Sequence, residues 1–355
     1  MSMTQTGTDT GPVSFVAPGA DTPRAPVSGE TDQKGRPPKH RLIVAVTGAT
    51  GFLGGHLLDS LTEAGHTVRA LTRRPQTERA GVSWIRGDLD NTESLMDLCR
   101  GADVLIHGAA LTKALTRDIF FDVNVTGSRK VFEAAAAAGI GHVIQVSSLA
   151  AREPRLSHYG ASKAAAELLL TARKWPFRWV NVRPPAVYGP GDREILKLLQ
   201  ALRYGFLPAP GSRNNRFSMM HARDLADALT LLCHGGNAGQ TVEIDDGHTG
   251  GYTLADVAAA LPAPFGGTGG KRRKPPIILS VPKPLLVTLG LVNGAVARLV
   301  RRPVTLTGSS ARYLCHADWT VRHALRPRLE GWQPKYALPQ GLAETIEWYR
   351  ARDLL

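Results

Sequence analysis

The sequence predicts an α/β fold built on a doubly wound parallel sheet, followed by a smaller C-terminal lobe. Short β-branched runs alternate with helical stretches from Arg41 onward, and this spacing is typical of a parallel sheet. A glycine-punctuated turn follows the first run directly. The length of 355 residues exceeds the usual size of a single domain, which favours two lobes around a cleft.

Strands and helices are predicted in alternation. The predicted strands cover residues 42–47, 67–72, 82–86, 104–109, 143–147, 178–183 and 240–244. The predicted helices cover residues 54–64, 92–100, 121–138, 159–174, 221–233 and 252–261. The C-terminal part contains a Gly-rich loop at 266–270, a basic run at 271–274 and an apolar stretch at 285–300.

Composition marks three regions. Residues 1–40 are rich in Thr, Gly, Pro and Asp without apolar periodicity, which predicts a disordered tail. The tail has no apolar signal core, so we expect a cytoplasmic protein, with the inner face of a membrane as a further location. The Gly-Pro-Gly run at 189–191 marks where the chain leaves the sheet. We therefore assign residues 41–183 and about 217–247 to the larger lobe, and about 184–216 and 248–355 to a substrate-binding lobe.

Charge and cysteine content narrow the classes of partner. Lys and Arg number 43 against 30 Asp and Glu, and the net charge of +13 favours a phosphorylated cofactor, anionic lipid headgroups or nucleic acid. Aromatic residues make up only 6% and do not interleave with the basic clusters, which argues against nucleic acid. The three cysteines are dispersed, so neither a disulfide framework nor a metal site is predicted.

The apolar stretch at 285–300 allows three interpretations of its structural role. Its roughly 16 apolar or small residues fall short of the ~20 that span a bilayer, so a transmembrane helix is not expected. It is a helix packed over the substrate pocket, a helix in a membrane interface between Lys283 and the arginines at 298–302, or both at once. Peripheral contact with an anionic membrane and a homodimer are both left open as partners.

The glycine turn predicts a dinucleotide site of the Rossmann type. Gly48, Gly51 and Gly54 are spaced as G-x-x-G-x-x-G between a predicted strand and a predicted helix. Glycines there let the backbone turn tightly and approach a pyrophosphate, while the helix N-terminus offers free N–H groups. The neighbouring residues assigned to the same site are Thr50, Phe52 and Leu53.

Residues after the second strand indicate which dinucleotide binds. NAD sites usually carry a carboxylate about 20 residues beyond the glycines, but no Asp or Glu occurs between Ala64 and Thr77. Arg73 and Arg74 instead offer two guanidiniums to a 2′-phosphate. This favours NADP(H), with NAD(H) as the alternative cofactor and solvated surface arginines as the alternative role.

Further cofactor contacts are expected after later strands. Asp88 is placed to hold the adenine amino group, or simply to cap a turn, and Leu89 beside it is assigned to the cofactor site. Ala109 lies in the run of small residues at 108–110 that leaves room over the sheet edge, whereas the nearby His107 is interpreted as structural. Asn124, within the next helix, is expected to support the site from beneath, with an exposed helical Asn as the alternative.

Tyr159 and Lys163 carry the predicted chemistry. Their i, i+4 spacing sets a phenol and an ammonium on one helix face, shortly after a strand that ends in two serines. A neighbouring ammonium stabilises a phenolate and lowers the phenol pKa toward neutrality, which makes proton transfer to a carbonyl oxygen feasible. A serine hydroxyl would hold that oxygen, and Lys163 would also bond the nicotinamide ribose.

These residues resemble the extended branch of the short-chain dehydrogenase/reductase superfamily, the NAD-dependent epimerase/dehydratase family. The resemblance covers Arg41 to about Ile244, through Thr47-Gly-Ala-Thr-Gly-Phe-Leu-Gly54, the Tyr159 to Lys163 motif and the segment at 183–191. It implies that the link at 183–191 leads into the substrate lobe, and Pro184 within it is assigned as a cofactor contact. The motif at 221–224 is given a structural role.

The resemblance also implies that the second of the two serines, Ser148, is the catalytic hydroxyl, with Ser147 as the fallback. One departure from the family's pattern is informative, because Ser148 reaches Tyr159 in only 11 residues. The short path is more similar to the branch of 3β-hydroxysteroid dehydrogenases, dihydroflavonol reductases and bacterial reductases of lipid ketones. It puts a nucleotide-sugar substrate in doubt.

We therefore expect an NADP(H)-dependent oxidoreductase that reduces a ketone, or oxidises the alcohol, of an apolar or lipid substrate. A 3-oxo-sphingolipid such as an oxidised ceramide is the specific substrate expected. A nucleotide-sugar epimerase or dehydratase with tightly bound NAD is a second hypothesis. A non-catalytic cofactor-binding subunit is a third.

Overall fold

The computed structural model describes residues 41–202, 205–262, 276–301, 304 and 306–355. The predicted tail at 1–40, the Gly-rich loop at 266–270 and the basic run at 271–274 lie outside the described residues.

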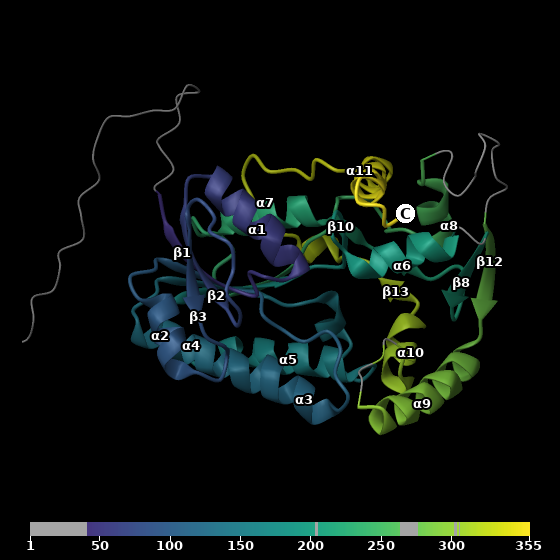
Figure 1. Ribbon diagram of the computed structural model, residues 1–355, viewed down its shortest axis with the longest axis horizontal. Coiled ribbons are helices and arrows are strands. Elements are labelled where there is room, and N and C mark those ends of the chain that lie inside the picture. Colours follow the sequence, from purple (N-terminus) through teal and green to yellow (C-terminus); the bar gives the residue numbers. More distant parts are fainter. Residues whose placement is uncertain (1–40, 203–204, 263–275, 302–303, 305) are drawn as a thin grey trace, which may run out of the picture. The chain divides into compact units, whose positions relative to one another are not determined.

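A seven-stranded parallel sheet forms the centre of the fold, in the order β11-β6-β5-β4-β1-β2-β3 (Figure 1). The strands are β1 (Ile43–Thr47), β2 (Thr67–Thr72), β3 (Val82–Arg86), β4 (Val104–His107), β5 (His142–Val146), β6 (Arg178–Arg183) and β11 (Gln240–Glu243). The strand order reverses between β1 and β4, and such a switch point opens a crevice at the carboxyl ends of the strands. The predicted α/β class with a doubly wound parallel sheet is confirmed.

Helices cover both faces of this sheet (Figure 1). On one face lie α1 (Phe52–Glu63) and α7 (Ala222–Leu232); on the other lie α2 (Thr92–Cys99), α4 (Ser128–Ala137) and α5 (His158–Thr171). Alternation along β1 explains the two layers, because Val44 and Val46 pack into the core beneath α1 and α7, whereas Ala45 packs into the opposite core. Both cores are buried and largely aliphatic, and the second also contains Phe132 and Phe177.

The prediction of one continuous helix at 121–138 is wrong. The chain instead forms α3 (Arg117–Phe121), a π-helical segment η1 (Asp122–Gly127) and then α4. The buried Asn124 lies within η1 and bonds both the N–H and the carbonyl of Leu111. Periodicity alone does not register such a tertiary contact, and π-helical turns are frequent at functional sites.

The remaining elements surround the carboxyl edge of the sheet. They are the short helix η2 (Leu149–Arg152), β7 (Ala186–Tyr188), α6 (Arg193–Leu202), β8 (Phe206–Pro210), β9 (Arg216–Phe217), β10 (Met219–His221), α8 (Leu254–Ala259), β12 (Ile277–Val281), α9 (Lys283–Leu299), α10 (Gly308–Leu314), β13 (Asp318–Trp319), η3 (His323–Leu325) and α11 (Leu338–Arg350). Three parallel strand pairs form, β10 with β7, β12 with β8 and β13 with β9. No helix of the described residues has the length and apolarity to cross a membrane.

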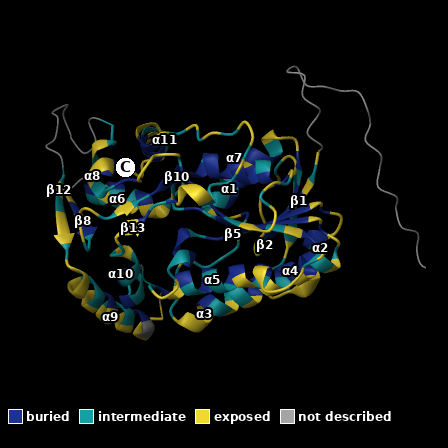
Figure 2. Cartoon of the chain, turned by 180° about the vertical axis from the view of Figure 1, so that it is seen from behind, coloured by how far each residue is buried: buried dark blue, intermediate teal, exposed yellow. Residues whose placement is uncertain are grey.

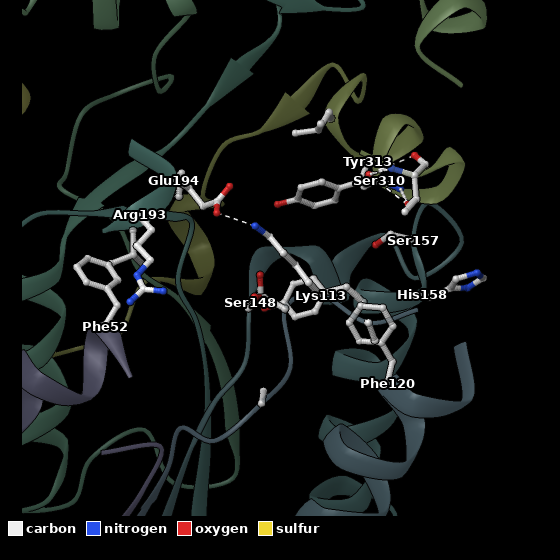
Figure 3. A pocket seen from close by; sticks show the side chains of 18 of the residues that line it. Phe52, Lys113, Phe120, Ser148, Ser157, His158, Arg193, Glu194, Ser310 and Tyr313 are labelled. Carbon is white, nitrogen blue, oxygen red and sulfur yellow. Dashed lines mark hydrogen bonds and ion pairs between the residues drawn. The ribbon is translucent and has the colours of Figure 1, made fainter. Parts of the chain in front are cut away.

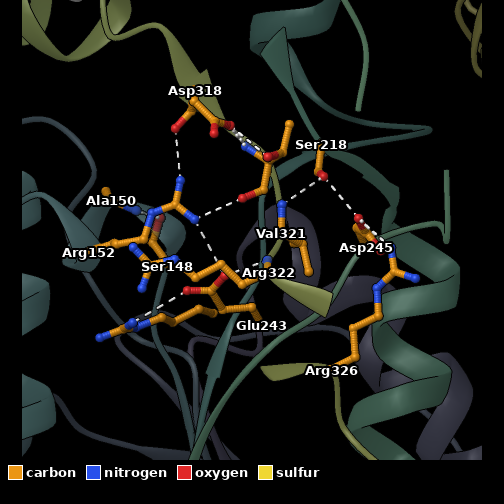
Figure 4. Close-up of polar contacts among 12 residues, drawn as sticks. Ser148, Ala150, Arg152, Ser218, Glu243, Asp245, Asp318, Val321, Arg322 and Arg326 are labelled. Carbon is orange, nitrogen blue, oxygen red and sulfur yellow. Dashed lines mark hydrogen bonds and ion pairs between the residues drawn. The ribbon is translucent and has the colours of Figure 1, made fainter. Parts of the chain in front are cut away.

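A polar clamp ties the segment after α10 to the main sheet (Figure 4). The Arg152 guanidinium donates to the carbonyl oxygens of Asp318 and Thr320, each at 2.8 Å, and lies 3.4 Å from the buried Glu243 carboxylate. Glu243 in turn accepts the backbone N–H of Arg322 at 2.9 Å. A cation that bonds two backbone carbonyls and a fully buried carboxylate holds this segment at a defined distance from η2.

The C-terminal helix α11 completes a separate apolar core with α6 and β7. Leu342 is fully buried there, beside Tyr188 and Leu199. We expect Leu342→Ala to lower the free energy of unfolding by about 2–5 kcal/mol, because it leaves a cavity that the surroundings cannot fill. Leu168→Ala, at a position 62% exposed on α5, serves as the control and should change it by less than about 0.5 kcal/mol. Urea unfolding measures both, and equal effects would contradict this packing.

Candidate active site

A cavity of about 1660 Å³ opens at the carboxyl edge of the sheet. The glycine turn forms one wall, and Ser148 and Tyr159 form another. Small and aliphatic residues of α9 and α10 close it from the opposite side: Gly290, Leu291, Gly294, Ala297, Gly308 and Leu314. Figure 3 shows Ser148, Lys113 and Tyr313 directed into the same space. The fold thus brings the two predicted motifs, far apart in sequence, to one cavity.

The glycine turn has the shape that a pyrophosphate requires. Gly48 adopts a φ of +79°, and a Cβ there would lie 2.7 Å from the backbone of Ala109. A Cβ on Gly54 would lie 2.2 Å from the Gly48 carbonyl oxygen, so only glycine lets α1 start this close to β1. Gly51 caps α1 without any side-chain hydrogen bond, which leaves the first N–H groups of the helix to an anion. Residues in this cradle fit a dinucleotide phosphate.

The predicted cofactor residues of the turn all line the cavity. They are Gly48, Thr50, Gly51, Phe52, Leu53 and Gly54. Beside the turn, a smaller hollow of about 230 Å³ is shared by Thr50 and Gly51 with Gln76, Thr77 and Arg79. The chain segment that follows β2 therefore lies next to the start of α1.

Two contacts at Gly160 hold Tyr159 beside Ser148. Ser157 caps helix α5, its hydroxyl accepting the Gly160 N–H at 2.9 Å, and a Cβ on Gly160 would lie 2.6 Å from the Ala150 carbonyl oxygen. This close approach seats the first turn of α5 on η2. Ser148 caps η2 through the Ala150 N–H and forms a side-chain hydrogen bond with Tyr159.

The expected pKa of Tyr159 is wrong in direction. Burial raises the pKa of the phenol above its ordinary value, and the hydrogen bond with Ser148 offsets only part of this. Lys163 is not among the groups that shift it. The i, i+4 spacing predicts a shared helix face but not the depth of each side chain, and the phenol is a protonated donor at neutral pH.

Lys163 is buried behind the cavity wall and its ammonium donates to the Val146 carbonyl oxygen at 2.7 Å. Burial lowers the pKa of Lys163 to about 8, although the Glu167 carboxylate acts in the opposite direction. The Lys163 charge and, above all, burial lower the pKa of His107 to about 3. The neutral His107 ring bridges Thr47 and Ser128, at 2.7 and 2.8 Å, consistent with a structural role.

The two serines at the end of β5 have different surroundings. Ser147 is buried and donates to the Glu167 carboxylate, which also receives two hydrogen bonds from Arg183 at 2.9 and 2.7 Å. Ser148 lines the cavity, whereas Ser147 does not. The geometry therefore favours Ser148 over Ser147 as the hydroxyl that meets a substrate.

Other predicted cofactor residues lie outside the cavity lining. Asn124 is buried, which rules out the exposed alternative, and joins the loop at Leu111 to Ser162 of α5. Asp88 is exposed and accepts the N–H groups of Asp90 and Asn91, the geometry of a turn cap.

Five more predicted contacts lie outside the lining. Leu89 packs on the backbone of Gly127, and the Ala109 N–H donates to Thr47. The Pro184 carbonyl accepts the N–H of Leu149, while the next residue, Pro185, lines the cavity. Arg73 and Arg74 are exposed directly after β2, and neither forms an ion pair with any other described residue.

Several residues at the cavity escaped the sequence analysis. Lys113 and Glu194 form an ion pair of 2.6 Å between the loop after β4 and the start of α6 (Figure 3). Phe120 and Tyr313 reach Tyr159 from α3 and α10, the Phe120 and Tyr159 rings having centroids 6.3 Å apart. The sequence could have indicated Gly160, because it adjoins the predicted Tyr159, and Lys113, because it follows the end of a predicted strand. No such feature of the sequence indicated Phe120 or Tyr313.

The family model described as the NAD dependent epimerase/dehydratase family matches residues 44–244. The chain belongs to this family. It is 40% identical over 320 residues to a ceramide reductase of Caulobacter vibrioides, covering 89% of this chain and 96% of that protein. It is 33% identical over 225 residues to 4-hydroxy-2-methyl-3-oxo-4-farnesyl-3,4-dihydroquinoline-1-oxide ketoreductase of Stigmatella aurantiaca, covering 57% and 67%.

A solved structure with the same fold is that of MoeE5 in complex with UDP-glucuronic acid and NAD. The TM-score is 0.63 at 25% identity, and the match covers 87% of this chain and 99% of that one. Together with the family assignment, these likenesses confirm the resemblance drawn from the motifs. The chain is an NAD(P)-dependent oxidoreductase.

Lys163→Met tests the charge state of the buried ammonium. Its pKa is about 8 in the folded chain and keeps the ordinary 10.5 when unfolded, so the unfolded state binds the extra proton between these values. Wild-type stability should therefore rise relative to the variant as pH increases through this window, by about 3 kcal/mol in all. Urea unfolding of both chains from pH 7 to 10.5 measures it; a pH-independent difference would contradict the buried, shifted lysine.

Proposed function

We propose that this protein is an NADP(H)-dependent reductase of a ketone on an apolar or lipid substrate. The observation that carries the proposal is the shared cavity, where Ser148 and Tyr159 meet walls of glycine and aliphatic side chains from α9 and α10. A cavity of about 1660 Å³ has room for a cofactor together with a long apolar substrate.

Proton donation falls to Tyr159. Because burial raises its pKa, the phenol keeps its proton at neutral pH, and this state suits reduction rather than alcohol oxidation. When bound, the nicotinamide supplies the hydride to the carbonyl carbon. Tyr159 then gives its proton to the carbonyl oxygen, which the Ser148 hydroxyl holds through a hydrogen bond.

Lys163 and His107 serve from behind this wall. The Lys163 ammonium, held by the Val146 carbonyl, is assigned to the nicotinamide ribose. The neutral His107 holds Thr47 at the end of β1, next to the glycine turn.

The choice of NADP(H) rests on Arg73 and Arg74. Their side chains lie exposed at the carboxyl edge, directly before the segment that shares a hollow with the glycine turn. Two guanidiniums without a carboxylate partner favour a 2′-phosphate over a bare ribose. Asp88 is proposed to hold the adenine with the carboxylate oxygen that the turn leaves free, and Leu89 and Pro184 to contact the cofactor.

A 3-oxo-sphingolipid such as an oxidised ceramide is the proposed substrate. Similarity to the ceramide reductase over most of both chains supports it, as does the apolar wall from α9 and α10. We also propose that the protein works at the inner face of a membrane, where such a substrate is concentrated.

A nucleotide-sugar epimerase is the second candidate, favoured by the fold shared with MoeE5 bound to a UDP-sugar. Recycling of tightly held NAD would leave absorbance at the nicotinamide wavelength unchanged during turnover. A screen of NADPH consumption across 3-oxo-lipids, ketosteroids, flavonoid ketones and nucleotide sugars separates the two. Turnover of nucleotide sugars alone would reverse our ranking.

Tyr159→Phe should slow ketone reduction by about 10²–10⁴-fold, because the proton donor is removed while the ring stays. NADPH binding, followed by nucleotide fluorescence, should change little. Phe120→Leu, a change in a ring that contacts Tyr159, is the comparison and should retain most turnover. Intact turnover in Tyr159→Phe would refute the assigned role.

Arg73→Ala/Arg74→Ala should raise KM for NADPH by about 10–100-fold, since two charge-assisted contacts to the 2′-phosphate are lost. KM for NADH should stay within about threefold. Arg100→Ala, an exposed arginine at the end of α2, is the matched control and should alter neither value. Equal effects on both cofactors would exclude a 2′-phosphate contact.

A further inference from the structure

Helix α9 presents two unlike sides. Its inward side consists of Gly290, Gly294 and Ala297, which line the cavity. Large aliphatic residues recur on its outward side at intervals of four, three, four and three positions, the spacing of one helix face. These residues are about half exposed or more: Leu285, Leu289, Val292, Val296 and Leu299. Figure 2 shows this exposed side of α9. We call these five residues the α9 stripe.

The stripe adjoins the cavity. Leu291 of α9 is 60% exposed and also lines the cavity, and Leu314 of α10 does both at 42% exposure. These two apolar side chains therefore belong both to the outer surface and to the lining of the cavity that holds Tyr159. In addition, β12, which leads directly into α9, leaves Ile277 and Leu279 more than half exposed.

Close backbone packing fixes α9 in this orientation. A Cβ on Gly290 would lie 2.5 Å from the backbone of Thr307, and one on Gly308 would lie 2.8 Å from the Leu291 side chain. The Asn293 side chain donates to the Leu306 carbonyl at 2.8 Å. Because glycines set the face that α9 turns toward α10, the helix cannot rotate its stripe inward without losing these contacts.

The stretch of sequence that contains the stripe carries charge of a single sign. No Asp or Glu occurs between Asp256 and Asp318, whereas nine Lys and Arg residues do. They are Lys271, Arg272, Arg273, Lys274, Lys283, Arg298, Arg301, Arg302 and Arg312. Lys283 and Arg301 are exposed at the two ends of α9. A half-exposed apolar stripe between cations is complementary to an anionic lipid surface, whose headgroups attract the charges while the acyl boundary accepts the stripe.

We propose that α9 docks on an anionic lipid bilayer through its stripe, and that the apolar substrate enters the cavity from the bilayer past Leu291 and Leu314. Docking stands on the stripe and its charges alone. Passage of a lipid ketone rests on the proposed function. The surface and the entrance are thus two sides of one helix.

Flotation with lipid vesicles tests the docking. The full chain should float with vesicles of phosphatidylcholine and phosphatidylglycerol, and about tenfold less with phosphatidylcholine alone. Leu289→Glu/Val296→Glu places two charges in the stripe and should weaken anionic-vesicle binding by about tenfold or more. Leu168→Glu, at a position 62% exposed on α5, is the matched control and should float like the wild type. If circular dichroism shows that one of these glutamate variants is not folded, Leu285→Ser/Val292→Ser repeats the test of the stripe with milder changes.

Turnover separates docking from the proposed function. With a short-chain, water-soluble ketone the stripe variant should match the wild type, whereas with a long-chain 3-oxo-lipid in vesicles it should be slower by about the same factor as its loss of binding. A wild type that floats with vesicles but reduces no ketone would overturn the proposed function, while the proposal that α9 docks on a bilayer would stand. Stripe variants that float like the wild type would overturn the docking. The docking would also be overturned if neither the wild type nor the stripe variant bound vesicles, and the wild type were a dimer that the two glutamates dissociate. In that case a second copy of the chain would cover α9.

Discussion

Two buried carboxylates, Glu167 of α5 and Glu243 at the end of β11, hold the parts of the candidate site together. Arg183 bonds Glu167 twice and lies 3.5 Å from Glu243, while Arg152 reaches Glu243 from the other side. A buried carboxylate without its partner is costly, so these contacts are made together or the region does not pack. Through them the end of β5, helix α5, strands β6 and β11 and the segment after α10 acquire one common geometry.

The chemistry depends on that geometry. Glu167 takes the hydroxyl of Ser147, which leaves Ser148 facing the cavity next to Tyr159. Arg152 fixes the chain beyond α10 by donating to two backbone carbonyls of that segment. Helix α10 in turn carries Tyr313, which lines the cavity. A reaction that needs a proton donor within hydrogen-bond reach of a carbonyl oxygen relies on such positioning more than on any single contact. The apolar side of the same cavity comes from α9, whose other side is exposed.

Much of this was accessible from local sequence. The alternating pattern from Arg41 predicted each strand of the main sheet to within two residues, because buried parallel strands need β-branched runs and leave little choice of register. The dinucleotide turn was equally clear, since only glycine tolerates the close approaches at Gly48 and Gly54. Family membership, confirmed by the match over residues 44–244, followed from these motifs. The prediction of one continuous helix at 121–138 was wrong because the side chain of Asn124 bonds a loop, and hydrophobic periodicity does not register such a contact.

By itself, the sequence determined the α/β class, the dinucleotide turn and the pairing of Tyr159 with Lys163 on one helix face, because each depends on neighbours along the chain. Tertiary structure decided the rest. It buried the phenol and so raised its pKa, turned Lys163 to the Val146 carbonyl, and separated the roles of Ser147 and Ser148. It also gave α9 a lining side and an exposed side. Burial and electrostatic environment arise from residues distant in sequence, and no local pattern encodes them.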